Sequence, residues 1–109
     1  MEQNEQFAPL RKGLLEFALL TLIGAGQVYA ADILARLEPT PFATQEGTLY
    51  PLLSKLRREE LVDYLWRESA AGPPRKYYQL TDKGRGRLAD LQAYWVTLSQ
   101  TLETLGRIP

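Results

Sequence analysis

The chain has 109 residues, of which 45% are hydrophobic, so the sequence favours one small domain with a modest core. It contains no Cys and no His, which excludes the usual zinc sites and catalytic triads, and we expect neither a metal nor another cofactor. Its 13 basic and 13 acidic residues give a net charge of zero, which disfavours unspecific attraction to nucleic acid.

The first predicted helix covers about residues 10–23, which are apolar on most sides, and the glycines of GAG at 24–26 end it. Its most apolar run is much shorter than the roughly 20 residues that span a bilayer and contains Glu16, so we expect no membrane segment. The preceding MEQNEQF lacks the basic and then apolar pattern of a secretory signal. The sequence therefore favours a cytoplasmic protein.

Two further helices are predicted from apolar residues that recur with the period of a helix. The second follows the Gly-rich turn, and its buried face is predicted to hold Ala30, Ile33, Leu34 and Leu37. The third covers about residues 45–58, with Thr44 as its N-cap. Its inward stripe is predicted to be Leu49, Leu52, Leu53 and Leu56.

The outward face of the third helix is unusual because it carries a Gly and a Pro. At 100° per residue, the positions opposite the leucine stripe are Gly47, Pro51, Ser54 and Arg58. A Pro inside a helix costs about 3 kcal/mol, but its ring presses on the carbonyl of Gly47, the residue type that adjusts most easily. Such a narrow, polar face suits the major groove of DNA. The alternative from these residues alone is a solvated face with an early proline.

After residue 61 the period changes to that of strands. Val62, Tyr64 and Trp66 alternate with their neighbours, and a second strand is predicted over residues 76–80. The intervening ESAAGPP predicts a loop too long for a two-residue hairpin turn, with a tip that projects as a wing. Basic residues gather over 75–87, so a local positive field is expected despite the neutral total.

The final predicted helix starts after Thr81, its N-cap, with Asp82 at the positive end, and runs to about residue 105. Large apolar residues recur along it at spacings of three and four, as in a coiled-coil seam. These residues are Leu88, Leu91, Trp95, Leu98, Leu102 and Leu105. A small domain has little surface left to cover them, so we expect a second copy of the chain to do so.

The predicted fold is mainly α with a small two-stranded β wing: a winged helix-turn-helix region over residues 1–81 and a long C-terminal dimerisation helix over 82–109. Both parts are expected to form one compact unit. The stretches RKGLLEFALLTLI, EGTLYPLLSKLRREELV and GPPRKYYQLTDKGRGRL, with Trp66 and Trp95, resemble the PadR family of bacterial transcriptional regulators, specifically its short members. The resemblance covers about residues 10–105.

This resemblance implies a homodimer that binds a two-fold related operator, usually as a repressor, with the third helix in the major groove and the wing over neighbouring backbone or minor groove. Thr48 and Tyr50 match the family's reading-helix motif, and Lys76 with Arg75 matches its basic pair beside the wing glycine. The predicted DNA-binding residues are Thr44, Gln45, Thr48, Tyr50, Ser54, Lys55, Arg58, Gly72, Arg75 and Lys76.

Two stretches depart from the family pattern. YAADI at 29–33 replaces the usual Tyr-Gly-Tyr-Glu-Ile, which alters the surface of the second helix. REEL at 58–61 replaces Lys-Asp-Gly-Leu, so the turn after the reading helix lacks the Gly that normally ends that helix.

Trp95 matches a family tryptophan that lies near the dimer centre, where some short members enclose a hydrophobic cavity for flat aromatic compounds. The resemblance thus implies a small aromatic or hydrophobic effector at Trp95, and the alternative is dimer packing without a cavity. Two other functions stay open, a protein-interaction module and a ligand-sequestering dimer, both without specific DNA binding. An enzyme is disfavoured because no nucleophile is paired with a base, and Glu59 and Glu60 are adjacent rather than opposed.

Single aromatic and basic residues near the wing have two interpretations. Packing within the wing is favoured over base stacking for Trp66, Tyr77 and Tyr78, because one side of a strand is buried. Arg85 and Arg87 are interpreted as solvated charges rather than phosphate ligands.

Overall fold

The computed structural model describes residues 2–108, and side chains from residue 5 onward. A short 3-10 helix over Glu2–Phe7 leads into α1 (Ala8–Gly24), which is followed by α2 (Ala30–Leu37) and α3 (Glu46–Arg58). The hairpin of β1 (Val62–Ser69) and β2 (Gly72–Leu80) comes next, and α4 (Asp82–Leu105) ends the chain. The predicted mainly α fold with a two-stranded wing is therefore confirmed.

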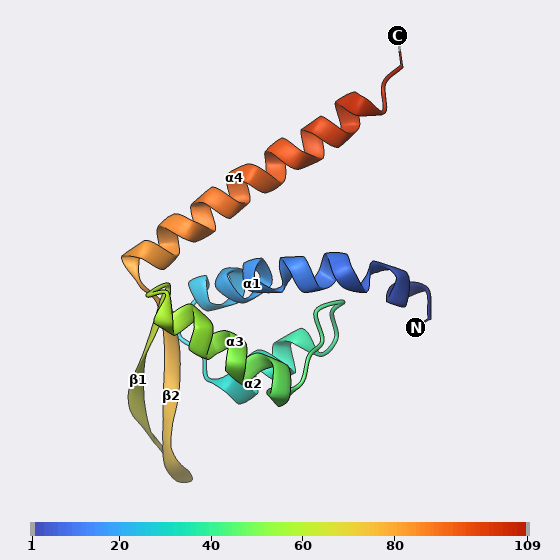
Figure 1. Ribbon diagram of the computed structural model, residues 1–109. Coiled ribbons are helices and arrows are strands. Elements are labelled where there is room, and N and C mark those ends of the chain that lie inside the picture. Colours follow the sequence, from blue (N-terminus) through green and yellow to red (C-terminus); the bar gives the residue numbers. More distant parts are fainter. Residues whose placement is uncertain (1, 109) are drawn as a thin grey trace.

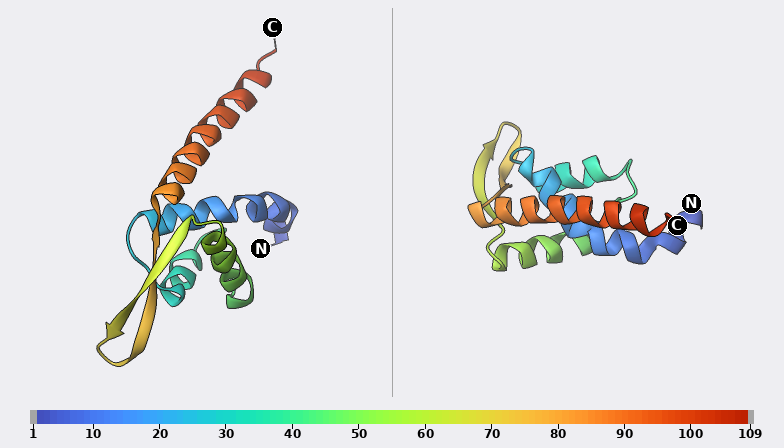
Figure 2. Two further views of the ribbon diagram at one scale, coloured as in Figure 1. Left: turned by 60° about the vertical axis from the view of Figure 1, so that its left-hand side comes forward. Right: turned by 90° about the horizontal axis from the view of Figure 1, so that it is seen from above.

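The elements form a compact group with two extensions (Figures 1 and 2). Helices α1, α2 and α3 pack together, and the hairpin projects from one side of this group as a wing. Helix α4 starts beside the base of the wing, crosses over α1 and extends away from the rest of the chain. The molecule is consequently elongated, with principal extents of 62, 35 and 21 Å.

The core lies where the three helices meet the base of the wing. Its fully buried side chains come from the periodic apolar positions that predicted the helices. They include Leu19, Leu20, Ile23, Ile33, Leu49, Leu53, Leu56, Leu61 and Val62. The predicted stripe of α3 is confirmed, with Leu52 partly buried at its margin.

The hairpin turn differs from the prediction. Ser69 pairs directly with Gly72, so only Ala70 and Ala71 form the turn, and the expected long loop is wrong. Pro73 and Pro74 lie inside β2, beside the irregular pairing near the tip of the hairpin. The register of the two strands shifts between Arg67 and Ser69, so the pairing is irregular just before the turn.

The start of α3 is also corrected. Thr44 is not the N-cap; Gln45 takes that position with extended backbone (φ −119°, ψ 165°), and no side chain caps the helix. The carbonyl of Gln45 accepts from the N–H groups of Thr48 and Leu49, which starts the helix through its backbone alone. Pro51 lies inside a continuous helix, and Gly47 has open space where a Cβ would stand.

The turn that ends α3 has the geometry of a glycine turn without the glycine. Glu60 adopts φ +62°, in the left-handed region that L residues rarely adopt. Its N–H donates to the carbonyl of Arg57 at 2.9 Å, and the N–H of Leu61 donates to that of Leu56 at 2.9 Å. These two bonds make a Schellman motif, closed by contact between buried Leu56 and Leu61. REEL thus makes a turn of the kind that glycine usually ends, with Glu60 in the left-handed position.

Helix α4 begins as predicted, since the Thr81 hydroxyl accepts from the Gly84 N–H at 2.9 Å. The predicted seam, however, divides into two parts. Leu88 and Leu91 are half-buried against the chain's own core. Its outer part is exposed: Trp95 by 45%, Leu98 by 38%, Leu102 by 69% and Leu105 by 73%.

Candidate nucleic-acid interface

The outward face of α3 is exposed as the sequence predicted. Gly47, Pro51, Ser54 and Arg58 all lie at the surface, because the leucine stripe on the opposite side anchors the helix to the core. Tyr50 flanks this strip and is 48% exposed. A helix with so little side chain on its outer face can approach another molecule closely.

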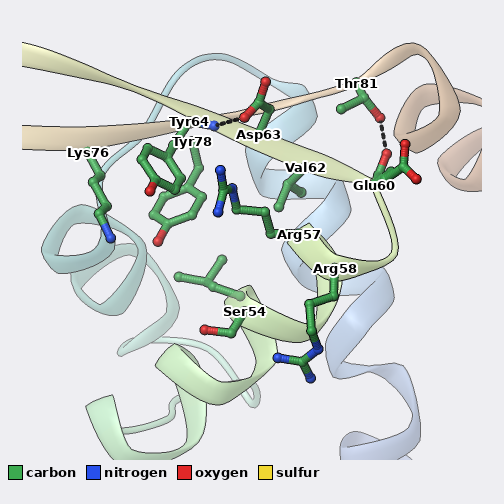
Figure 3. A pocket seen from close by; sticks show the side chains of 11 residues that line it. Ser54, Arg57, Arg58, Glu60, Val62, Asp63, Tyr64, Lys76, Tyr78 and Thr81 are labelled. Carbon is green, nitrogen blue, oxygen red and sulfur yellow. Dashed lines mark hydrogen bonds between the residues drawn. The ribbon is translucent and has the colours of Figure 1, made fainter.

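A groove of about 460 Å³ separates the second half of α3 from the wing (Figure 3). Helix α3 contributes Ser54, Arg57 and Arg58 to its walls, and the wing contributes Tyr64, Lys76 and Tyr78. The wing residues face the groove because strand alternation puts Tyr64 and Trp66 on one side of β1, with Tyr64 opposite Tyr78 of β2. Helix and wing therefore present one continuous polar surface.

Two cations of this surface, Arg57 and Lys76, lie on aromatic rings. The Arg57 guanidinium carbon is 4.4 Å from the centre of the Tyr64 ring, and Lys76 Nζ is 4.6 Å from the same centre. Lys76 also lies 5.5 Å from the Trp66 ring. On the alternate strand positions, which point to the other face of the hairpin, Arg67 lies over Tyr77 at 5.1 Å and Arg75 over Tyr29 at 4.4 Å. A ring positions a cation but carries no net charge, so these cations keep their full charge toward solvent.

Among the described residues, five other cations, including Lys55 of α3, are paired with carboxylates. Glu16 holds both Arg87 (3.0 Å) and Lys55 (3.7 Å), and Lys55 also lies 3.9 Å from Glu59. Further pairs join Arg36 to Asp32, Arg85 to Asp82 and Arg107 to Glu103. Within residues 5–108, no such ion pair involves Arg57, Arg58, Arg67, Arg75 or Lys76. Arg57, Arg58 and Lys76 therefore leave positive charge without a carboxylate partner around the groove between α3 and the wing.

The rings of Tyr64 and Tyr78 lie together in the groove, with their centres 5.7 Å apart. Burial raises the pKa of Tyr78, nearby Tyr50 and Tyr64 raise it further, and Arg57 lowers it in part. The Tyr78 hydroxyl stays neutral at physiological pH and remains a hydrogen-bond donor. Its ring is almost fully buried, which confirms the wing-packing interpretation of Tyr78. Trp66, by contrast, is 61% exposed on the wing surface.

The predicted DNA-binding residues divide into groups. Tyr50, Ser54, Arg58, Arg75 and Lys76 line the groove and the adjoining hollow between Tyr50 and the wing. Three others, Thr44, Gln45 and Thr48, lie at the far end of α3, away from the wing. Gly72 is at the wing tip, and the ammonium of Lys55 is turned to carboxylates.

Sequence reasoning missed Arg57 and Tyr64. A signal for each was present: Arg57 follows the outward-facing Ser54 by three residues, which places both on one side of a helix. Tyr64 shares the period-two pattern of Trp66. Their contact with each other depends on how the helix and the hairpin pack, and no sequence spacing shows that.

Comparison with known proteins decides the family. A family model described as "Transcriptional regulator PadR-like family" matches residues 19–90, which is more than half of the chain. The chain belongs to the PadR-like family. It is thus a DNA-binding regulator of transcription with a winged helix-turn-helix fold.

Solved structures of similar proteins agree with this PadR-like assignment. A PadR-like transcription factor from Bacteroides fragilis is 41% identical, with 94% of this chain and 99% of that one covered and a TM-score of 0.79. A PadR-like regulator from Bacillus cereus is 33% identical, with 94% and 100% covered and a TM-score of 0.83. An uncharacterized protein of Lysinibacillus sphaericus is 25% identical over 84% of this chain and 87% of its own length. In the part described here, this PadR-like chain has no helix long and apolar enough to cross a membrane.

Proposed function

We propose that the protein is a cytoplasmic repressor that binds a two-fold related operator as a homodimer, with α3 in the major groove and the wing on the neighbouring backbone or minor groove. The observation that carries this proposal is the division of the cations. Arg57 and Lys76 lie on the Tyr64 ring between α3 and the wing, whereas Lys55, Arg85 and Arg87 lie on carboxylates. Phosphates attract only charge that is not already neutralised.

The exposed polar groups of α3 contact the base edges and so read the DNA sequence. Thr48, Tyr50 and Ser54 offer hydroxyls on or beside the bare strip, and Thr44 and Gln45 lie at its N-terminal end. Arg58, Arg75 and Lys76 contact the DNA backbone, and Gly72 allows close approach at the wing tip. Lys55 can contact a phosphate only when its ammonium leaves the carboxylates of Glu16 and Glu59.

Dimerisation is supported by the outer part of α4. The exposed side chains of Trp95, Leu98, Leu102 and Leu105 share one face, and each is worth roughly 1.5–3 kcal/mol when buried. A second copy that covers this face, with Leu88 and Leu91 packed within each chain, would set the distance between the two reading helices. That distance must be near 34 Å for adjacent half-sites.

An effector role for Trp95 is supported by a cavity of about 500 Å³ beside it. Its lining is almost entirely apolar and comes from α1, the segment after α2, and α4, including Leu14, Phe17, Leu22, Phe42 and Trp95. We propose a small aromatic or hydrophobic effector there, which would shift α4 relative to α1 and so change the spacing of the reading helices. Such a shift would release the operator.

Selection from a library of randomised duplexes, followed by fluorescence anisotropy over a salt series, tests the proposal. The selected duplex should bind about a thousandfold more tightly than unrelated DNA. Lys76→Ala should weaken binding to all duplexes about equally, and Thr48→Ala should change the preferred sequence. Arg85→Ala is the matched control, because its charge is already paired with Asp82. Weak DNA binding without sequence preference would instead support a protein-interaction module or a ligand-sequestering dimer.

A further inference from the structure

We infer that Arg57, Tyr64 and Lys76 form a clamp for one phosphate of the DNA backbone, in the groove between α3 and the wing. Arg57 and Lys76 are the phosphate ligands, and Tyr64 is a positioning residue that holds both cations. This inference rests on the proposed function and adds residues that the family motifs do not supply.

The clamp is defined by two cations that share one ring. Arg57 and Lys76 lie 4.4 and 4.6 Å from the centre of the Tyr64 ring, one from the helix and one from the wing. Figure 3 shows the rings of Tyr64 and Tyr78 between the Lys76 amine and the Arg57 guanidinium. Two like charges near one ring repel each other, and no carboxylate among the described residues is paired with either. A bound anion removes that repulsion.

The other groups at the groove favour an anion with several acceptor oxygens. Ser54, Arg58 and the phenol of Tyr78 are hydrogen-bond donors there. Two carboxylates also border the groove, those of Asp63 and Glu60. Figure 3 shows both directed away from the clamp, and Asp63 accepts from the Tyr64 N–H at 2.8 Å on the other side of the strand. Phosphate fits this set of donors, since charge-assisted bonds from Arg and Lys to its oxygens are strong.

The position of the groove favours DNA over a free anion. Ser54 and Arg58 belong both to the groove and to the outward face of α3. A duplex that takes α3 into its major groove must therefore run one backbone strand toward the junction of α3 and wing. The groove also continues past Lys76 into the hollow that contains Tyr50 and Arg75, so a strand can follow it.

The test measures affinity and its salt dependence on the selected duplex for the wild type, Arg57→Gln, Tyr64→Phe and Tyr64→Leu. Arg57→Gln should cost about tenfold for each half-site and lower the slope of log K against log salt by about 0.9 per lost phosphate, or about 1.8 per dimer. Tyr64→Phe keeps the ring and should bind like the wild type. Tyr64→Leu removes the ring and should bind like Arg57→Gln, with circular dichroism checking that it is folded.

Methylphosphonate substitution of the DNA, which neutralises one phosphate at a time, tests the clamp without any change at Tyr64. One position in each half-site should weaken the wild type about tenfold and weaken Arg57→Gln clearly less, because only Lys76 then contacts that phosphate. Unchanged affinity and slope for Arg57→Gln would overturn the clamp while specific binding by the wild type still supports the proposed function. Competition by millimolar inorganic phosphate that requires Arg57 would overturn it in favour of a free-anion site. Failure of the wild type to prefer any duplex would refute the proposed function itself.

Discussion

Replacing Glu60 by Gly should stabilise the protein, because the turn after α3 holds this residue at φ +62°. A left-handed conformation costs an L residue about 1–2 kcal/mol and costs Gly almost nothing. Gly in turn loses about 0.5–1 kcal/mol more backbone entropy on folding. The hydrogen bonds of the turn are made by the backbone and survive the change. The net gain should be about 0.5–1 kcal/mol, or a rise in Tm of about 2–6 °C.

Thermal and urea unfolding, followed by circular dichroism at one fixed chain concentration, would measure this difference. Glu59→Gly is the matched control: the neighbouring residue has φ −82°, so glycine there should destabilise the protein. Glu60→Ala removes the same charge and keeps the strain, and should show no gain. If Glu60→Gly is no more stable than the wild type, or Glu60→Ala gains as much, the backbone strain is not the cause.

Two further changes test packing and electrostatics. Gly84→Ala should destabilise by about 2–3 kcal/mol in urea unfolding, since a Cβ would collide with the carbonyl oxygen of Leu61. Gly86→Ala, on the same helix with open space around it, should be neutral or stabilising by up to about 1 kcal/mol, and equal losses at both sites would contradict the packing explanation. Glu16→Gln should cost less than about 1 kcal/mol of stability yet raise DNA affinity several-fold by anisotropy, because it removes one of the two carboxylates that hold Lys55 on α3. Unchanged affinity would show that Lys55 contacts no phosphate.

Most secondary structure could be predicted because its signals are local. The leucine spacing of α3 and the Thr81 cap of α4 depend only on residues within one or two turns. The hairpin turn was misplaced for the opposite reason. Gly72 and the following prolines are typical of a loop, but the pairing of Gly72 with Ser69 is set by the register of the whole hairpin. Both prolines lie beside the irregular pairing near the tip, a position at which a sheet tolerates proline.

The sequence by itself determined which segments are helix and strand, which side of α3 is bare, and where apolar residues gather on α4. These are properties of period and spacing along one element. The tertiary structure alone decided which cations keep their charge. Arg57 and Lys55 both lie on α3, but Arg57 meets the Tyr64 ring of the wing and Lys55 meets Glu16 of α1. The charge available to DNA therefore depends on which neighbour each cation finds, and that neighbour is distant in the sequence.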